Sequence, residues 1–228
     1  DGYLGMYLFL MGKYLEKTEN TDLPEYWKKG ISLALKKIQS LMRDGITQVS
    51  EENTTAYLMD NLEVWKGLHE LEDTQAISEM RKKIQAQIEN IFWDDANQRW
   101  RIIGNSDLYD QTEFYPDGVA QIYPLIYEFP VKEKKKQKIL YKQFTERFQW
   151  QKLNKKRNGF LWAMTGMAAA QMGDINNLVE LIGNYETEYC ENRKYPLYTG
   201  EAGWICMECE KLYRLYERKI KTGFILCA

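Results

Sequence analysis

Four carboxylates stand at or near the start of four helices that the sequence predicts: Asp1, Asp60, Asp117 and Glu201. A pair of such groups can carry general acid and base chemistry, in which one neutral acid donates a proton and one ionised carboxylate activates water. The alternative is helix capping, because an acidic side chain in a first turn stabilises the helix by about 1 kcal/mol. Four acids at one shared mouth favour a functional cleft, and capping stays open for each of them.

Aromatic side chains accompany these acids in the same loops and helix starts. The residues that would offer flat apolar faces to a ligand are Tyr115, Trp162 and Tyr198. Acids beside aromatic platforms suit a sugar ring, since hydroxyl groups pair with carboxylates and the C–H side of the ring packs on an aromatic face. Ordinary core packing is the alternative for such residues, for Trp162 above all.

Two kinds of helix must position these groups. One-sided amphipathic patterns, typical of helices that face a core, span 25–43, 75–92, 133–148 and 174–188. Helices that are apolar nearly all round, which predicts burial on every side, span 3–15, 57–68, 119–129, 160–172 and 201–213. Pro124 should kink the third of these. The alternation predicts an all-α fold, with inner helices wrapped by outer helices in an α/α toroid that forms a single domain over 1–228.

Loop lengths indicate which end of the inner helices holds the site. The connections from outer to inner helices are long, and they span 44–56, 93–114, 149–158 and 189–198. The connections from inner to outer helices are short. All long loops therefore lie at the N-terminal ends of the inner helices, where the four acids are.

Composition excludes several classes of protein. The net charge is −2 with acids and bases interspersed, which argues against a nucleic-acid partner. No apolar run is long enough to span a membrane. Cys206 and Cys209 form a CxxC inside a predicted helix, without the second pair that a zinc site needs, so no metal and no cofactor is expected. Reduced thiols favour a cytoplasmic location. The sequence begins without a methionine, so the localisation stays open.

Five segments together resemble the six-hairpin glycosidase-like superfamily, whose members are bacterial (α/α)6 toroids. They are DGYLGMYLFLMGKYLEKT, YLMDNLEVWKGL, FYPDGVAQIYPL, FLWAMTGMAAAQMGD and YTGEAGWICMECEKL, in chain order. The resemblance implies a carbohydrate-active protein whose cleft holds an acid and a base at the N-terminal ends of the inner helices. The matching positions are Asp1, Asp60 with Asn61, Asp117 and Glu201.

The sequence departs from this superfamily in its number of helices. A complete toroid has six inner and six outer helices, whereas about five inner and four outer helices are predicted here. The ring would then be incomplete on its N-terminal side. Upstream helices or a partner would cover its open flank.

The leading hypothesis is a glycoside hydrolase acting on an oligosaccharide or polysaccharide. Asp117, with its apolar flanks, is the predicted acid, and Asp60, beside Asn61 and Glu63, is the predicted base, although the roles could be exchanged. The other predicted substrate-binding residues are Asp1, Asn61, Tyr115, Trp162, Tyr198 and Glu201. An epimerase is disfavoured because the single histidine, His69, lies about 13 Å along its helix from Asp60. A lyase that uses a tyrosine base, and a non-catalytic carbohydrate-binding or scaffold domain, remain alternatives.

Overall fold

The structure is a computed structural model that describes residues 1–18, 23–71, 74–104, 106, 113–152, 162–193 and 197–225, with side chains described as far as 220. Within these ranges it contains nine α-helices and two short antiparallel hairpins. The prediction of an all-α fold is thereby confirmed. None of the helices in the described ranges is long and apolar enough to cross a membrane.

The chain divides into two compact units, Asp1–Gln111 and Thr112–Ala228, each with its own dense network of contacts. We describe each unit by itself. The expectation of a single domain over 1–228 stays a prediction.

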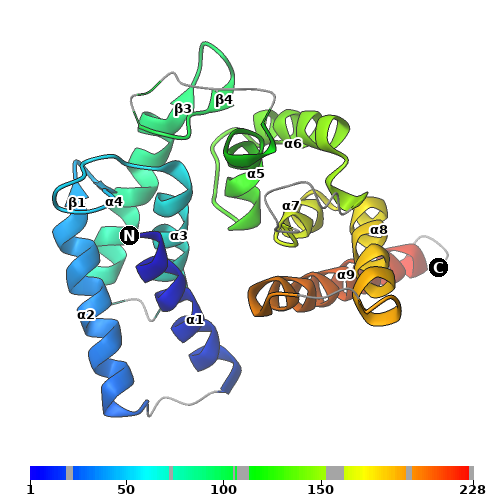
Figure 1. Ribbon diagram of the computed structural model, residues 1–228, viewed down its shortest axis with the longest axis horizontal. Helices are drawn as coiled ribbons and strands as arrows, with labels where there is room; N and C mark the ends of the chain where they lie inside the picture. Colours follow the sequence, from blue (N-terminus) through cyan, green and yellow to red (C-terminus); the bar gives the residue numbers. More distant parts are fainter. Residues whose placement is uncertain are drawn as a thin grey trace. The chain divides into compact units, whose positions relative to one another are not determined.

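The first unit is built on two pairs of helices (Figure 1). Its helices are α1 (Gly2–Thr18), α2 (Glu25–Leu41), α3 (Leu58–Glu70) and α4 (Gln75–Phe92). A hairpin follows each amphipathic helix: β1 (Met42–Arg43) pairs with β2 (Ile46–Thr47) after α2, and β3 (Trp93–Asp94) pairs with β4 (Arg99–Trp100) after α4. The two hairpins therefore occupy the start of two of the predicted long loops.

Helices α1 and α3 approach each other closely because glycines lie at their interface. A Cβ atom on Gly5 would lie 2.5 Å from the backbone of Glu63 and Val64, and one on Gly67 would lie 2.2 Å from the carbonyl oxygen of Gly5. At the far end of the pair, Glu70 of α3 forms ion pairs of 2.7 Å with Lys13 of α1 and with Lys66 of its own helix. This tight pair is the centre of the first unit.

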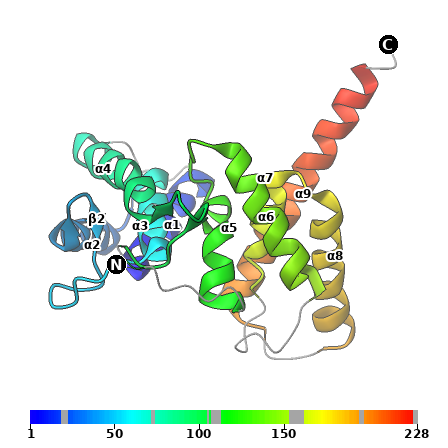
Figure 2. The ribbon, with the colours of Figure 1, turned by 90° about the horizontal axis from the view of Figure 1, so that it is seen from above.

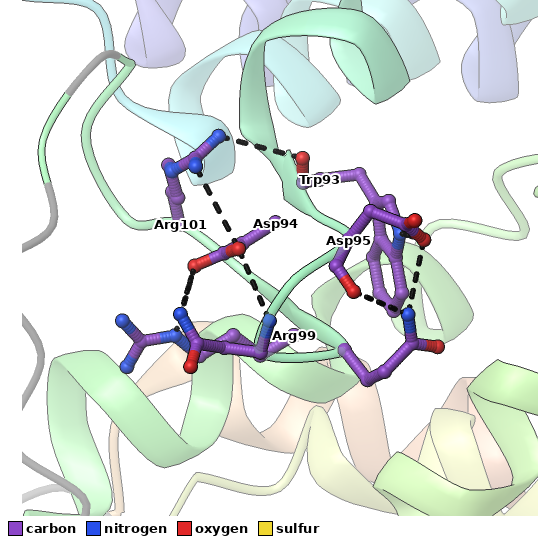
Figure 3. Close-up of polar contacts among 7 residues, drawn as sticks. Trp93, Asp94, Asp95, Arg99 and Arg101 are labelled. Carbon is purple, nitrogen blue, oxygen red and sulfur yellow. Dashed lines mark hydrogen bonds and ion pairs between the residues drawn. The ribbon is translucent and has the colours of Figure 1, made fainter.

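The β3–β4 hairpin is stabilised by a carboxylate that faces several donors (Figure 3). Asp94 is 2% exposed, and it accepts hydrogen bonds from the backbone N–H (3.2 Å) and side-chain amide (2.8 Å) of Asn97. Arg99 and Arg101 form ion pairs with the same carboxylate at 3.5 and 3.7 Å. The hydrogen bond from the Asn97 side chain and the nearby arginines hold the pKa of Asp94 below its usual value. These contacts stabilise the turn between β3 and β4, so Asp94 has a structural role.

The second unit contains the remaining helices. They are α5 (Val119–Ile126), α6 (Lys134–Phe148), α7 (Thr165–Met172), α8 (Ile175–Tyr185) and α9 (Thr199–Ile225). Short helical turns precede α5 at Phe114–Gly118, follow α6 at Trp150–Lys152 and extend α8 at Glu186–Glu191. α5 packs on α6 and α7, and α9 packs on α7 and α8. All eight residues of α5 are buried, as predicted.

Several predicted details were wrong. α1 exposes one face, with Tyr3 and Leu10 at 95% and 60%, so it is not buried on every side. The same holds for α9, on which Tyr213 and Ile220 are exposed.

The helix predicted over 119–129, with a kink at Pro124, is shorter than expected. It ends two residues after Pro124, at Ile126. Glu128 has a left-handed backbone with a φ of 58°, and the N–H of Phe129 donates back to the carbonyl oxygen of Pro124 at 2.8 Å, which is how many helices terminate.

Candidate active site

The first unit gathers Asp1, Thr47 and Asn61 around the start of α3. The hydroxyl of Thr47 donates a hydrogen bond of 2.7 Å to Asp1 Oδ2. A Cβ atom on Gly2 would lie 3.0 Å from Asp60 Oδ1 and 2.4 Å from Glu63 Oε2, so both carboxyl groups lie against the first turn of α1. Three predicted site residues, Asp1, Asp60 and Asn61, are thus brought together.

The environment of Asp60 differs from the prediction, in which polar neighbours keep its carboxyl group ionised. Burial raises the pKa of its carboxyl group, because it removes part of the water that would stabilise the ionised form. Its environment suits an acid better than the predicted base, which favours the exchanged role.

Asn61 is not available to a substrate, which corrects its predicted role. The side chain is 0% exposed. Its carbonyl oxygen accepts from the backbone N–H of Thr47 at 2.8 Å, and its amide donates to the carbonyl oxygens of Thr47 and Tyr57 at 3.0 and 2.9 Å. Asn61 therefore fastens the β1–β2 hairpin to α3.

Replacing Asn61 by Ala should destabilise the first unit by about 2–4 kcal/mol, because the buried backbone groups of Thr47 lose their partners. The midpoint of urea denaturation measures the loss. Asn90→Ala is the matched control on the exposed face of α4, and it should change the free energy of unfolding by about 0.5 kcal/mol or less. An unchanged midpoint with weakened sugar binding would instead restore the predicted substrate contact.

The second unit contains an aromatic cluster built from two separate segments. The rings of Tyr115 and Trp162 lie 4.7 Å apart between centroids with an interplanar angle of 33°. Phe114 packs against Trp162 edge to face at 5.8 Å, and it is buried, whereas Tyr115 is 39% exposed. Tyr115 has an extended backbone, and Trp162 has a left-handed one with a φ of 56°. Together they form a platform with one accessible ring.

Glu201, in the first turn of α9, reaches the segment that follows Trp162. Its Oε2 atom accepts a hydrogen bond of 2.7 Å from the backbone N–H of Ala163, and the Tyr185 hydroxyl donates to the same atom at 3.4 Å. Burial raises the pKa of Glu201, and the hydrogen bonds to its charged form only partly oppose this effect. Glu201 is therefore both a cap of the segment before α7 and a carboxyl group suited to hold a proton.

Asp117 lies two residues after Tyr115 and two before α5. Its side chain is 5% exposed, and its backbone carbonyl accepts a hydrogen bond of 3.1 Å from the Gln121 side chain. Tyr198, just before α9, is 52% exposed.

The predicted acid and base fall in different units, Asp60 in the first and Asp117 in the second. Their pairing stays a prediction. Within the second unit, Glu201 contacts the residue that follows Trp162, and Asp117 lies two residues after Tyr115 in the sequence.

Sequence reasoning missed three residues that the structure places beside the acids: Thr47, Tyr185 and Glu208. Thr47 and Glu208 are 0% exposed and Tyr185 is 3% exposed. A signal existed for Glu208, because it lies seven residues after Glu201 and so shares its face of the helix. In the part of the chain that the structure describes, no group of His, Cys, Asp and Glu side chains could hold a metal ion.

Comparisons with protein-family models, with curated proteins and with solved structures gave no match for this chain.

Proposed function

We propose that this protein is a glycoside hydrolase that acts on an oligosaccharide or polysaccharide through carboxylates of its second unit. The observation that carries the proposal is the platform of Tyr115 and Trp162 beside Glu201, whose pKa burial raises. An accessible ring provides the apolar face that a sugar needs, and a neutral carboxyl group next to it can protonate a glycosidic oxygen.

Glu201 is the proposed general acid. Its Oε2 atom accepts hydrogen bonds from Ala163 and Tyr185, and in its neutral form the carboxyl group would carry the transferable proton. Asp117 is the proposed second carboxylate, which would activate water in its ionised form. This assignment moves the acid from Asp117 to Glu201, because burial raises the pKa of the Glu201 carboxyl group.

The arrangement that we propose for the helices is an incomplete α/α toroid. Alternation of burial supports it, since all of α5 and most of α3 and α7 are buried. The amphipathic helices bury only one stripe each, for example Ile77, Ile84, Ile88 and Phe92 of α4. Upstream helices or a partner on the open flank belong to the same proposal.

A non-catalytic carbohydrate-binding domain is the second candidate. One observation favours it: the Glu201 carboxylate accepts a short hydrogen bond from the backbone N–H of Ala163, as a purely structural cap would. Such a domain would use the same aromatic platform and would release no product.

Replacing Tyr115 by Ala should weaken sugar binding and leave the fold intact, because the ring is partly exposed and its loss removes one side of the platform. Burying roughly 60–80 Å² of apolar surface on the ring is worth about 2 kcal/mol, or roughly a 30-fold rise in Kd. Isothermal titration calorimetry, with an oligosaccharide selected from a glycan array, measures the change.

Two controls accompany this variant. Tyr115→Phe keeps the ring and should bind within about threefold of the wild type, and Tyr216→Ala removes a tyrosine from the exposed face of α9 and should have no effect. Equal affinity of Tyr115→Ala and the wild type would contradict a sugar site on this platform.

A further inference from the structure

Glu208 is a buried carboxyl group that the proposed hydrolysis does not use. It lies on α9 and is 0% exposed, and neither carboxyl oxygen forms a hydrogen bond with the residues that the structure describes. A buried polar group without a partner costs free energy, and a charge costs far more. Native structures seldom retain such a group in its ionised form.

Gly166 of α7 makes room for this carboxyl group. A Cβ atom on Gly166 would lie 2.5 Å from the carboxyl carbon and from Oε1 of Glu208. Any other residue at position 166 would thus displace the side chain. The carboxyl group therefore lies at the contact between α7 and α9, and Figure 2 shows α9 running past α7 and α8 toward the C-terminus.

The ionisable groups around Glu208 make its ionisation unfavourable. α7 (TGMAAAQM) carries no ionisable side chain. α8 contributes the Tyr185 hydroxyl, whose own pKa is raised by burial and by the charges of Glu201 and Glu208, and the exposed Glu180. α9 contributes Glu201 and Cys209, and among the residues whose side chains are described no cation acts on Glu208.

The pKa of Glu208 is raised well above its usual value, first by burial and then by the charge of Glu201. The negative charge of Glu201 therefore favours the neutral form of the Glu208 carboxyl group.

We propose that Glu208 is a protonation-dependent latch between α7 and α9, closed while its carboxyl group is neutral and loosened when the group ionises. The latch does not depend on the proposed hydrolysis. It would nevertheless affect the candidate site, because α9 also carries Glu201, and loosening α9 would withdraw Glu201 from Ala163.

The pH dependence has a definite sign. The folded pKa lies above the unfolded one, so the stability that the neutral group provides is complete below about pH 4.5 and is lost as the pH rises through the folded pKa. Across that window the unfolding equilibrium constant of the wild type should rise relative to Glu208→Gln, by up to about tenfold per pH unit.

The test is urea denaturation of the full chain from pH 4.5 to 9, together with hydrogen exchange of the α7 and α9 amides. Wild type should lose stability and amide protection toward high pH, whereas Glu208→Gln should not. Glu208→Met, which removes ionisation and hydrogen bonding together, should behave as Glu208→Gln does. Glu210→Gln, an exposed site on the same helix, should follow the wild type.

Parallel stability profiles for the wild type and Glu208→Gln across this pH range would overturn the latch. So would unchanged protection of α7 and α9 in the wild type at high pH. The buried amide of Glu208→Gln could change the free energy of unfolding by the same amount at every pH. Because only the pH dependence is compared, such a constant difference does not affect the result.

Discussion

Replacing Glu201 by Gln is expected to lower the kcat of hydrolysis by about 10²–10⁴-fold, the usual contribution of a general acid. The amide cannot donate a proton to a leaving oxygen, but its carbonyl oxygen can still accept the hydrogen bond from Ala163 N–H. The fold should therefore survive, and sugar affinity should change little. Product formation and thermal unfolding of the same preparation measure the two effects.

Glu210→Gln is the matched control for this variant, since it makes the same chemical change at an exposed position of α9. It should retain full activity. If Glu201→Gln instead keeps its activity and loses several degrees of thermal stability, Glu201 is a helix cap and the proposed acid is wrong.

Replacing Gly67 by Ala should destabilise the first unit by about 2–4 kcal/mol. The new Cβ atom would lie 2.2 Å from the Gly5 carbonyl oxygen, and backbone on both helices must move to accommodate it. Helix propensity alone predicts the opposite sign, since Ala is favoured over Gly in a helix by about 1 kcal/mol. The midpoint of urea denaturation separates the two expectations.

Gly183→Ala provides the matched control in α8. A Cβ atom at Gly183 would meet none of the described residues within 4 Å, so only helix propensity acts and stability should rise by about 0.5–1 kcal/mol. A stabilising effect of Gly67→Ala would show that α1 and α3 are not packed as closely as this structure has them.

The helices could be predicted where their hydrophobic pattern is strong. α4 begins and ends at the predicted residues, 75 and 92, because its buried residues recur with the helical period. The exposed faces of α1 and α9 could not be predicted, since a helix that is apolar all round does not reveal which side is left uncovered. The two hairpins are two-residue pairings, too short to give an alternating pattern.

The candidate site could be predicted only in outline. The acids do lie at the helix starts, and Tyr115 does pair with Trp162. What each acid contacts could not be predicted, because it depends on residues distant in sequence: Asn61 binds the hairpin that ends at Thr47, and Glu201 binds Ala163. The spacing of seven residues places Glu208 on the same face of α9 as Glu201, but its burial against Gly166 of another helix could not be predicted.

The most direct test of the proposed hydrolysis is mass spectrometry of an oligosaccharide panel after incubation with the full chain. We expect shortened oligosaccharides with the wild type, and none above background with Glu201→Gln, which should still bind the same sugars. Sugars that bind to the wild type and remain intact would identify a carbohydrate-binding domain. That result would contradict the assignment of Glu201 and Asp117 as catalytic groups.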